Sequence, residues 1–133
     1  MDVQEGTGTE DANRAAMMRF WEATESGNLE SAAELVHPDI TMEWPQSGER
    51  FSGLDNALGA LRATEVRPEM AGEPSLEGCG DLWVARAPLR YGEEIYHYVG
   101  VFSLQDGKIR HTTEYFGAPF PPNPGRAAFS DSR

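Results

Sequence analysis

The chain lacks the features that mark several common classes of protein. It has one cysteine, Cys79, which excludes an internal disulfide, and no cluster of Cys and His has the spacing of a zinc site. No apolar run approaches the length of about 20 residues that a helix needs to cross a bilayer. Residues 1–11 are acidic and polar, unlike a secretory signal or a transit peptide. We therefore expect a cytoplasmic protein with no metal.

Basic residues are also scarce. The chain has 11 Lys and Arg against 22 Asp and Glu, a formal net charge of −11. Binding to nucleic acid depends mainly on basic side chains that neutralise phosphates, and anionic membrane surfaces attract the same side chains. The charge therefore predicts good solubility, with neither nucleic acid nor a membrane as a partner.

The order of predicted elements indicates one α+β domain. The 133 residues suit one core. Residues 1–10 are predicted to be a flexible arm, 11–117 the domain, and 118–133 a Pro-rich irregular tail in which Phe120 and Phe129 could cover a cavity mouth. Three helices are expected first: one from near Thr9 or Asp11 to Gly27, one from Asn28 to Pro38, and one from a capping box at 52–55 to about Arg62.

Strand-like patterns occur in two places. Ile40 to Trp44 is predicted to form a short hairpin with the segment at Phe51, after a turn at 46–48. Residues 66–72 are expected to be a linker. Strands are then predicted at 75–79 and 82–89, followed by a long hairpin over 93–116. Helices followed by a run of antiparallel strands are typical of an α+β fold.

The long hairpin carries the most specific chemistry. Asp106-Gly107 is a strong signal for a two-residue turn, which predicts that Leu104 lies opposite Ile109 and Val99 opposite Glu114. Opposed residues share a face of the sheet. One face would then carry Tyr98, Phe102, Leu104, Ile109 and Tyr115. The other, resembling the wall of a small-molecule cavity, would carry His97, Val99, Val101, Thr112, Glu114 and Phe116.

Glu114 is the leading candidate for general acid/base chemistry. Apolar neighbours would desolvate its carboxyl group, which raises the pKa of a carboxylic acid. A structural ion pair with Arg86 or Arg110 is the equally weighted alternative, and Arg86–Glu114 is the expected contact. His97 would share the Glu114 face, either as a proton shuttle or as a structural core residue.

Two phrases carry a resemblance to a known family: MMRFWEATESGNLESAAELVHPDITMEWPQSGERFSG and DGKIRHTTEYFG. They resemble the SnoaL-like branch of the nuclear transport factor 2-like superfamily, across about residues 16–116. The resemblance implies a cone-shaped α+β barrel, in which three N-terminal helices pack on a curved, mainly antiparallel sheet that encloses a pocket. It also implies a homodimer through the outer sheet face, centred on Tyr98, Phe102, Ile109 and Tyr115.

The resemblance removes some activities. Ketosteroid isomerases of this superfamily place a tyrosine and two aspartates where this chain has Phe20, Trp44 and Val99, so their steroid isomerisation is excluded. The arginine and last aspartate of limonene epoxide hydrolases fall on Arg86 and Glu114, but their other aspartate falls on Pro88. Polyketide cyclases of the branch also place an acid/base aspartate near Glu114.

The sequence therefore predicts a binder of a small hydrophobic molecule. If it is an enzyme, we expect a cofactor-free isomerase, cyclase or hydratase acting on a carbonyl compound, with Glu114 as acid/base, Arg86 orienting it and His97 shuttling a proton. A non-catalytic ligand-binding or dimerisation module is the alternative. The predicted pocket lining is Phe20, Trp21, Trp44, Val99, Thr112 and Phe116.

Overall fold

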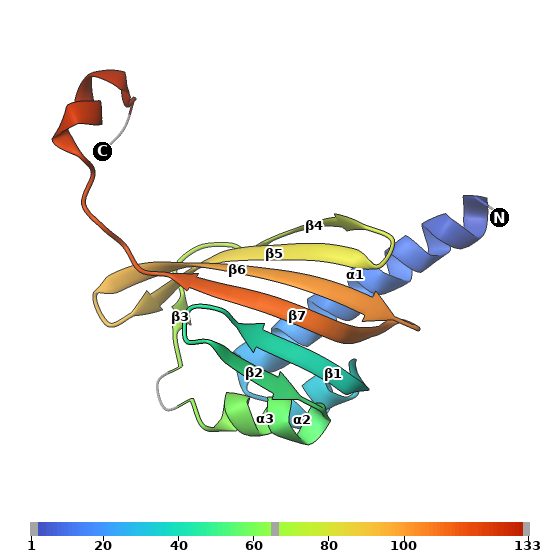
Figure 1. Cartoon of the computed structure of the whole chain (residues 1–133). Helices are drawn as coiled ribbons and strands as arrows, with labels where there is room; N and C mark the ends of the chain where they lie inside the picture. Colours follow the sequence, from blue (N-terminus) through green and yellow to red (C-terminus); the bar gives the residue numbers. More distant parts are fainter. Residues whose placement is uncertain (1–2, 65–66, 132–133) are drawn as a thin grey trace.

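The computed structural model describes residues 3–64 and 67–131. Its helices are α1 (Val3–Ser26), α2 (Leu29–Ala33), α3 (Leu54–Arg62) and a 3₁₀ helix, η1 (Pro124–Phe129). Its strands are β1 (Val36–Trp44), β2 (Glu49–Ser52), β3 (Glu69–Met70), β4 (Ser75–Cys79), β5 (Leu82–Tyr91), β6 (Glu94–Gln105) and β7 (Lys108–Gly117). Figure 1 shows the three long strands β5, β6 and β7 side by side.

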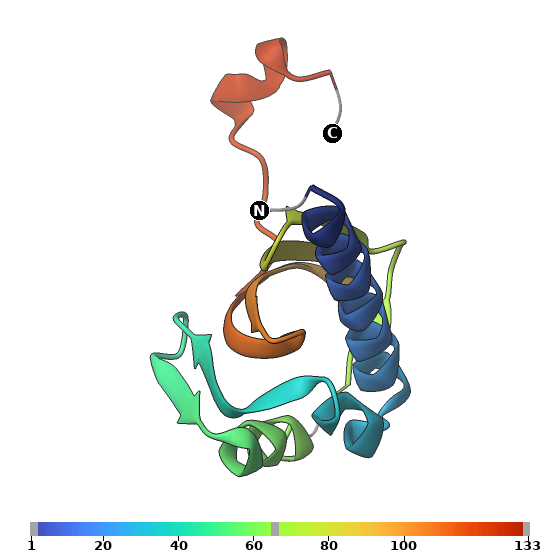
Figure 2. The ribbon, with the colours of Figure 1, turned by 90° about the vertical axis from the view of Figure 1, so that its right-hand side faces the viewer.

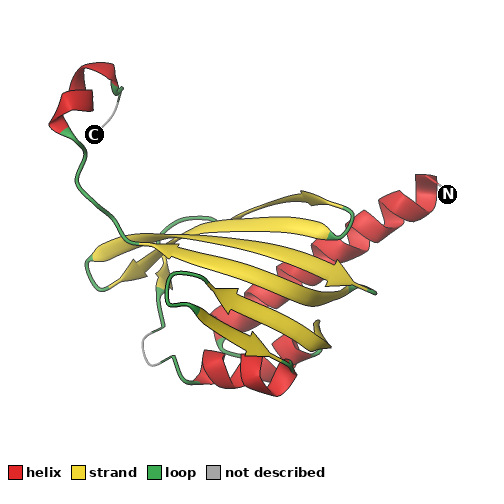
Figure 3. Ribbon diagram, in the orientation of Figure 1, coloured by secondary structure: helices red, strands yellow, loops and turns green. Residues whose placement is uncertain are grey.

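Within the described residues the strands form one mixed, open sheet in the order β2-β1-β7-β6-β5-β3, and β4 also pairs with β5. Pairing is antiparallel except between β1 and β7. Helix α1 runs along one side of the curved strands, and α2 and α3 lie below them in Figure 2. Figure 3 separates the strands, in yellow, from the helices, in red. This arrangement confirms the predicted α+β fold.

Helix α1 packs one face on the sheet. Ala16, Met17 and Ala23 are buried at helical spacing. Asn13 is also buried, and its amide donates to the Gly80 carbonyl oxygen at 2.8 Å, which ties the helix to the turn between β4 and β5. The helix begins at Val3, well before its predicted start. Of the predicted flexible arm, residues 1 and 2 lie outside the described part.

The first hairpin and α3 lie where the sequence predicted them, but the segment before the hairpin differs. Helix α2 ends at Ala33, and β1 already begins at Val36 and runs through Pro38. The prediction that Pro38 closes a helix is therefore wrong. The pairing of β1 with β7 shifts between Val36 and Thr41, and proline is tolerated in a strand at such an irregularity. The predicted capping box is not formed, because Gly53 caps α3 without a side-chain hydrogen bond.

The predicted linker contains a short strand. Residues 69–70, inside the segment 66–72, pair with the end of β5 as β3. The first residue of that segment, Val66, lies outside the described residues.

The long hairpin has the predicted turn but a different register. Leu104 pairs with Ile109, as expected, and Asp106 has a positive φ of 54°. Beyond that pair β7 contains one extra residue, Arg110, so that Ser103 pairs with His111. A bulge of this kind leaves its extra residue unpaired and shifts all later pairs. The predicted Val99–Glu114 pair is therefore wrong, and Glu114 lies opposite Gly100.

The bulge rearranges both predicted faces of the hairpin. On β7 the inward residues are the predicted ones, Thr112, Glu114 and Phe116, but on β6 they are Tyr98, Gly100 and Phe102. Tyr98, Phe102 and Ile109 are 5%, 1% and 0% exposed, so they form core and not an outer surface. The predicted dimer centre is wrong for these three residues. Tyr115 alone of the four is exposed.

The C-terminal tail extends away from the domain (Figure 1). Residues 118–123 are irregular, as the prolines predict, but Pro124–Phe129 form the 3₁₀ helix η1, so the prediction of an irregular tail is wrong there. Phe120 and Phe129 are 81% and 87% exposed, so neither covers a cavity mouth in this structure. Residues 132 and 133 lie outside the described part.

Candidate functional site

A cavity of about 720 Å³ lies between the inner face of the sheet and the helices. This volume is within the range of small-molecule sites. Most of its wall is apolar: Phe20, Trp21, Leu29, Val36, Ile40, Met42, Trp44, Leu54, Ala57, Leu58, Leu61, Met70, Leu89, Tyr98, Phe102 and Phe116. The exposed lining residues, which mark its mouth, include Glu25, Gln46, Ser47, Glu49, Arg62, Thr64 and Arg67.

The mouth is held together by side-chain contacts to backbone. Arg67 donates to the carbonyl oxygens of Thr24 and Glu25, both at 2.8 Å, which joins the end of α1 to the segment after α3. Gln46 donates to the Phe116 carbonyl oxygen at 2.9 Å and accepts from the Phe116 N–H, so its amide imitates a strand partner. The two Gln46 hydrogen bonds fix the turn between β1 and β2 beside the cavity.

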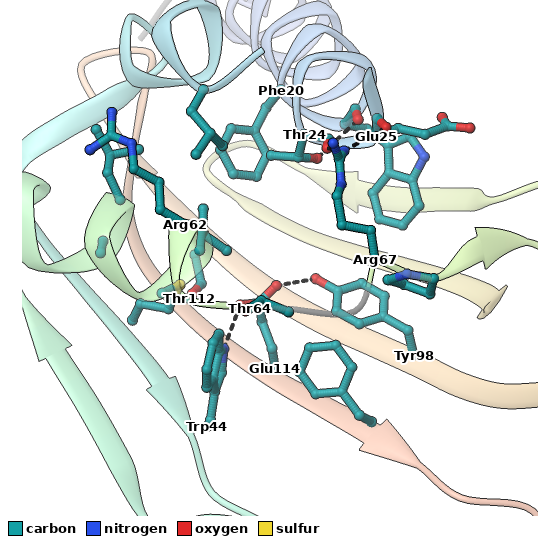
Figure 4. A pocket seen from close by; sticks show the side chains of 18 of the residues that line it. Phe20, Thr24, Glu25, Trp44, Arg62, Thr64, Arg67, Tyr98, Thr112 and Glu114 are labelled. Atoms are coloured by element: carbon teal, nitrogen blue, oxygen red, sulfur yellow. Dashed lines mark hydrogen bonds between the residues drawn. The ribbon is translucent and has the colours of Figure 1, made fainter. Parts of the chain in front are cut away.

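Glu114 is the carboxyl group in the cavity wall. Trp44 Nε1 donates to Glu114 Oε1 at 2.9 Å, and the Tyr98 hydroxyl is hydrogen-bonded to Glu114 Oε2. Figure 4 shows both side chains directed at the carboxyl group. Strands β1, β6 and β7 each supply one of the three residues, so the sheet itself sets their spacing.

Burial raises the pKa of Glu114 above its ordinary value of 4.5, although the hydrogen bonds from Tyr98 and Trp44 lower it in part. Desolvation disfavours a charged carboxylate, whereas donors stabilise it. Burial, and then the nearby Glu114 carboxyl group, also raise the pKa of Tyr98 well above 10.0. Burial therefore shifts both groups toward their neutral forms.

Gly100 makes room for the Tyr98 hydroxyl. A Cβ atom at Gly100 would lie 2.3 Å from that hydroxyl oxygen and 2.6 Å from a carbon of the Phe102 ring. Glycine in a strand interior often marks such a close approach. The Tyr98 ring is also packed by Trp21 and Phe116, at centroid distances of 5.7 Å and 5.2 Å. The hydroxyl is thus fixed beside Glu114.

Two polar groups in the wall lack a partner within the described residues. They are the Thr112 hydroxyl and the Trp21 indole N–H. Thr112 is 2% exposed, and a buried polar group without a hydrogen bond costs free energy. These groups lower stability unless something else satisfies them.

The structure brings some of the predicted site residues together and separates others. Glu114, Phe20, Trp21, Trp44, Thr112 and Phe116 all line the cavity. His97 and Val99 point to the outer face, because the bulge in β7 exchanged the inward residues of β6. Arg86 pairs with Val99 on that outer side and forms an ion pair with Glu77, so the expected Arg86–Glu114 contact is wrong. Arg110 donates to the Asp39 carbonyl oxygen and not to Glu114.

Tyr98 is the site residue that the sequence interpretation missed. The sequence predicts it on the outer face, because the bulge at Arg110 carries no Gly or Pro that would mark it. Gly100 was the available signal, since it interrupts an otherwise bulky strand and indicates close packing.

Within residues 3–64 and 67–131, no group of three or more His, Cys, Asp or Glu side chains could hold a metal ion. In the same residues no helix is long and apolar enough to cross a membrane.

The profile of the SnoaL-like domain matches residues 17–112. The chain belongs to the SnoaL-like domain family. This confirms the resemblance on which the fold was predicted. No curated protein matches the chain.

Solved structures of the nuclear transport factor 2-like superfamily share the SnoaL-like fold. A protein of unknown function from Burkholderia xenovorans is 29% identical, with a TM-score of 0.78 over 92% of this chain and 96% of that one. A candidate ketosteroid isomerase from Kribbella flavida is 22% identical, with a TM-score of 0.81 over 93% and 91%. A candidate polyketide cyclase from Sinorhizobium meliloti is 20% identical, with a TM-score of 0.64 over 75% and 93%. The last two likenesses show the fold alone.

Proposed function

We propose that this SnoaL-like protein binds a small hydrophobic carbonyl compound and transfers a proton to or from it, with Glu114 as the general acid/base. The observation that carries the proposal is a desolvated carboxyl group of raised pKa in the wall of an apolar cavity. A raised pKa brings a carboxylic acid closer to the range in which it can both hold and release a proton during catalysis. Isomerisation, cyclisation and hydration of a carbonyl compound all use such a group.

Exchange of hydrogen next to a carbonyl group tests the proposal without knowledge of the natural substrate. The protein would be incubated in D₂O with 1-tetralone and similar cyclic ketones, and deuterium at the α-carbon would be followed by NMR. We expect Glu114→Gln to lower the exchange rate by about 10²–10⁴-fold, the usual contribution of general acid/base catalysis.

Glu43→Gln is the matched control. Glu43 lies on β1 beside β7 but interacts with Arg50 and His111, and it does not line the cavity. We expect its exchange rate to equal that of the wild type. Equal exchange in wild type and Glu114→Gln would remove Glu114 from the catalytic role.

A non-catalytic ligand-binding module is the second candidate. It is favoured by the fact that both oxygens of Glu114 already have hydrogen-bond partners, Trp44 and Tyr98. Ketone binding without any protein-dependent exchange would support this candidate over the enzyme. The homodimer and the cytoplasmic location remain predictions, and the predicted dimer surface now retains only Tyr115 of its four residues.

A further inference from the structure

The bonding of Trp44 decides where a proton on Glu114 must sit. An indole N–H can only donate, so Glu114 Oε1 must act as an acceptor in every protonation state. The carbonyl oxygen of a carboxylic acid is a better acceptor than its hydroxyl oxygen, so the Trp44 hydrogen bond favours a proton on Oε2, the oxygen that faces the Tyr98 hydroxyl.

The direction of the Tyr98 hydroxyl follows from this. When Glu114 is a carboxylate, Tyr98 donates its hydrogen to Oε2. When Glu114 is neutral, the Oε2–H group donates to the Tyr98 oxygen, because a phenol can both donate and accept. The hydrogen of Tyr98 is then free to point into the cavity, which both residues line.

We propose that Tyr98 is the residue that contacts the ligand, by donating a hydrogen bond to an acceptor oxygen such as a carbonyl oxygen, and that neutral Glu114 orients this donor. The inference rests on the proposed function and assigns the ligand class as an apolar molecule with an accepting oxygen. In a full transfer, the Tyr98 proton moves to the ligand oxygen while the Oε2 proton moves to Tyr98. The ligand then gains one proton, Glu114 becomes a carboxylate, and Tyr98 is unchanged.

The position of Gly100 supports the inference independently. Glycine at the point opposite Glu114 leaves space for the Tyr98 hydroxyl and the edge of the Phe102 ring, and a Cβ atom there would push the hydroxyl away from Glu114.

The other titratable groups that line the cavity are not hydrogen-bonded to Glu114 within the described residues. They are Glu25 from α1, Glu49 from β2, Arg62 from α3, Tyr91 from β5, and Arg67. Arg67 is held by backbone carbonyl oxygens. Within the described residues, no hydrogen bond or ion pair joins any of the five to Glu114, so the orientation of Tyr98 follows the protonation of Glu114.

The test compares two probes of similar shape, 1-tetralone and the hydrocarbon tetralin. Their dissociation constants would be measured against pH for the wild type, Tyr98→Phe and Tyr91→Phe. One neutral hydrogen bond contributes modestly, so we expect the wild type at low pH to prefer tetralone by about three- to tenfold. Tyr98→Phe should bind both probes equally. Tyr91→Phe, which loses a hydroxyl elsewhere in the same wall, should keep the preference.

Glu114→Gln provides a second and sharper variant. Trp44 must face the amide oxygen, which places the amide NH₂ group against the Tyr98 oxygen and imitates the neutral acid permanently. The tetralone preference should then persist at every pH, whereas in the wild type it should fall as Glu114 ionises. A preference that survives in Tyr98→Phe, or one that rises with pH in the wild type, would overturn the inference. Loss of α-exchange would affect only the proposed function, because these measurements report binding.

Discussion

Glu43 and Glu114 lie on neighbouring strands of the same sheet, yet they face opposite environments. Glu43 pairs with Thr113 in register and points outward, 3.5 Å from Arg50 and 3.7 Å from His111 Nε2. Glu114 is the next residue on β7 and points inward, where it contacts the neutral donors of Trp44 and Tyr98. Successive side chains of a strand point to opposite faces of the sheet, so a shift of one residue moves a carboxylate from a charged, hydrated surface into a desolvated cavity.

The two faces differ mainly in the surroundings of their carboxylates. The inner face offers an apolar wall and neutral donors, whereas the outer face offers a cation and water. Exposed ion pairs are screened by water and contribute little to stability. A desolvated carboxyl group instead changes its protonation, and its neighbours must be placed to fit it. We therefore expect substitutions on the inner face to have larger effects than matched substitutions elsewhere.

The largest effect on stability is expected at Gly100. In Gly100→Ala the new methyl group would displace the Tyr98 ring from its position beside Glu114, since it would lie 2.3 Å from the hydroxyl. Overpacking of this kind typically costs about 1–3 kcal/mol. Urea denaturation would measure the loss in the free energy of unfolding.

Gly59→Ala is the control, because a Cβ atom at this position of α3 meets nothing within 4 Å. Alanine is the better helix former by about 1 kcal/mol, so this variant should be as stable as the wild type or more stable. Equal stability of Gly100→Ala and Gly59→Ala would show that the Tyr98 ring does not occupy the space above Gly100.

The next effect is a pH dependence of stability. The folded state holds the Glu114 proton more tightly than the unfolded state, because burial raises the pKa of this group. Its contribution to stability is therefore fully present below the ordinary pKa of 4.5 and is lost as the pH rises through the folded pKa. The loss amounts to about 1.4 kcal/mol for each unit by which folding raises the pKa.

Subtraction of a variant isolates this contribution from those of the other carboxylates. The stability of the wild type minus that of Glu114→Gln should fall as the pH rises above 4.5. The same difference taken with Glu43→Gln should not show this fall, since the Glu43 side chain lies on the outer face, partly exposed, beside Arg50. A difference for Glu114→Gln that rises with pH would mean that the carboxylate is stabilised by folding.

The sequence predicted the architecture well, because periodicity and turn residues act locally. The helix stop at Gly27 and the turn at Asp106-Gly107, with its first pair Leu104–Ile109, follow from local rules. The bulge at Arg110 does not. It coincides with the irregular start of β1, where Arg110 donates to the Asp39 carbonyl oxygen, so it depends on a strand about 70 positions away.

The bulge also explains which part of the site could be predicted. Ile109 and Thr112 are three positions apart and would face opposite sides of a regular strand, but the extra residue Arg110 lets both face inward. Beyond the bulge, β7 keeps its predicted inward residues. The partner strand β6 is then shifted by one, which moves Tyr98 inward and His97 and Val99 outward. The faces were thus predictable within β7 beyond the bulge, but not for Ile109 before it, nor for the relation between strands.

The smallest effect expected on the two faces concerns adjacent threonines of β7. Thr112 faces inward with a buried hydroxyl group that has no partner within the described residues, whereas Thr113 faces outward and is partly exposed. Replacing an unsatisfied buried hydroxyl group by a methyl group of similar shape removes a desolvation penalty, so Thr112→Val should raise the free energy of unfolding by about 1 kcal/mol. Thr113→Val should stay within about 0.5 kcal/mol of the wild type, as surface substitutions usually do.

Chemical denaturation of both variants in the ligand-free protein would check this. A loss of stability in Thr112→Val would show that the hydroxyl group has a partner such as an internal water molecule, and that the inner wall is already satisfied without a ligand.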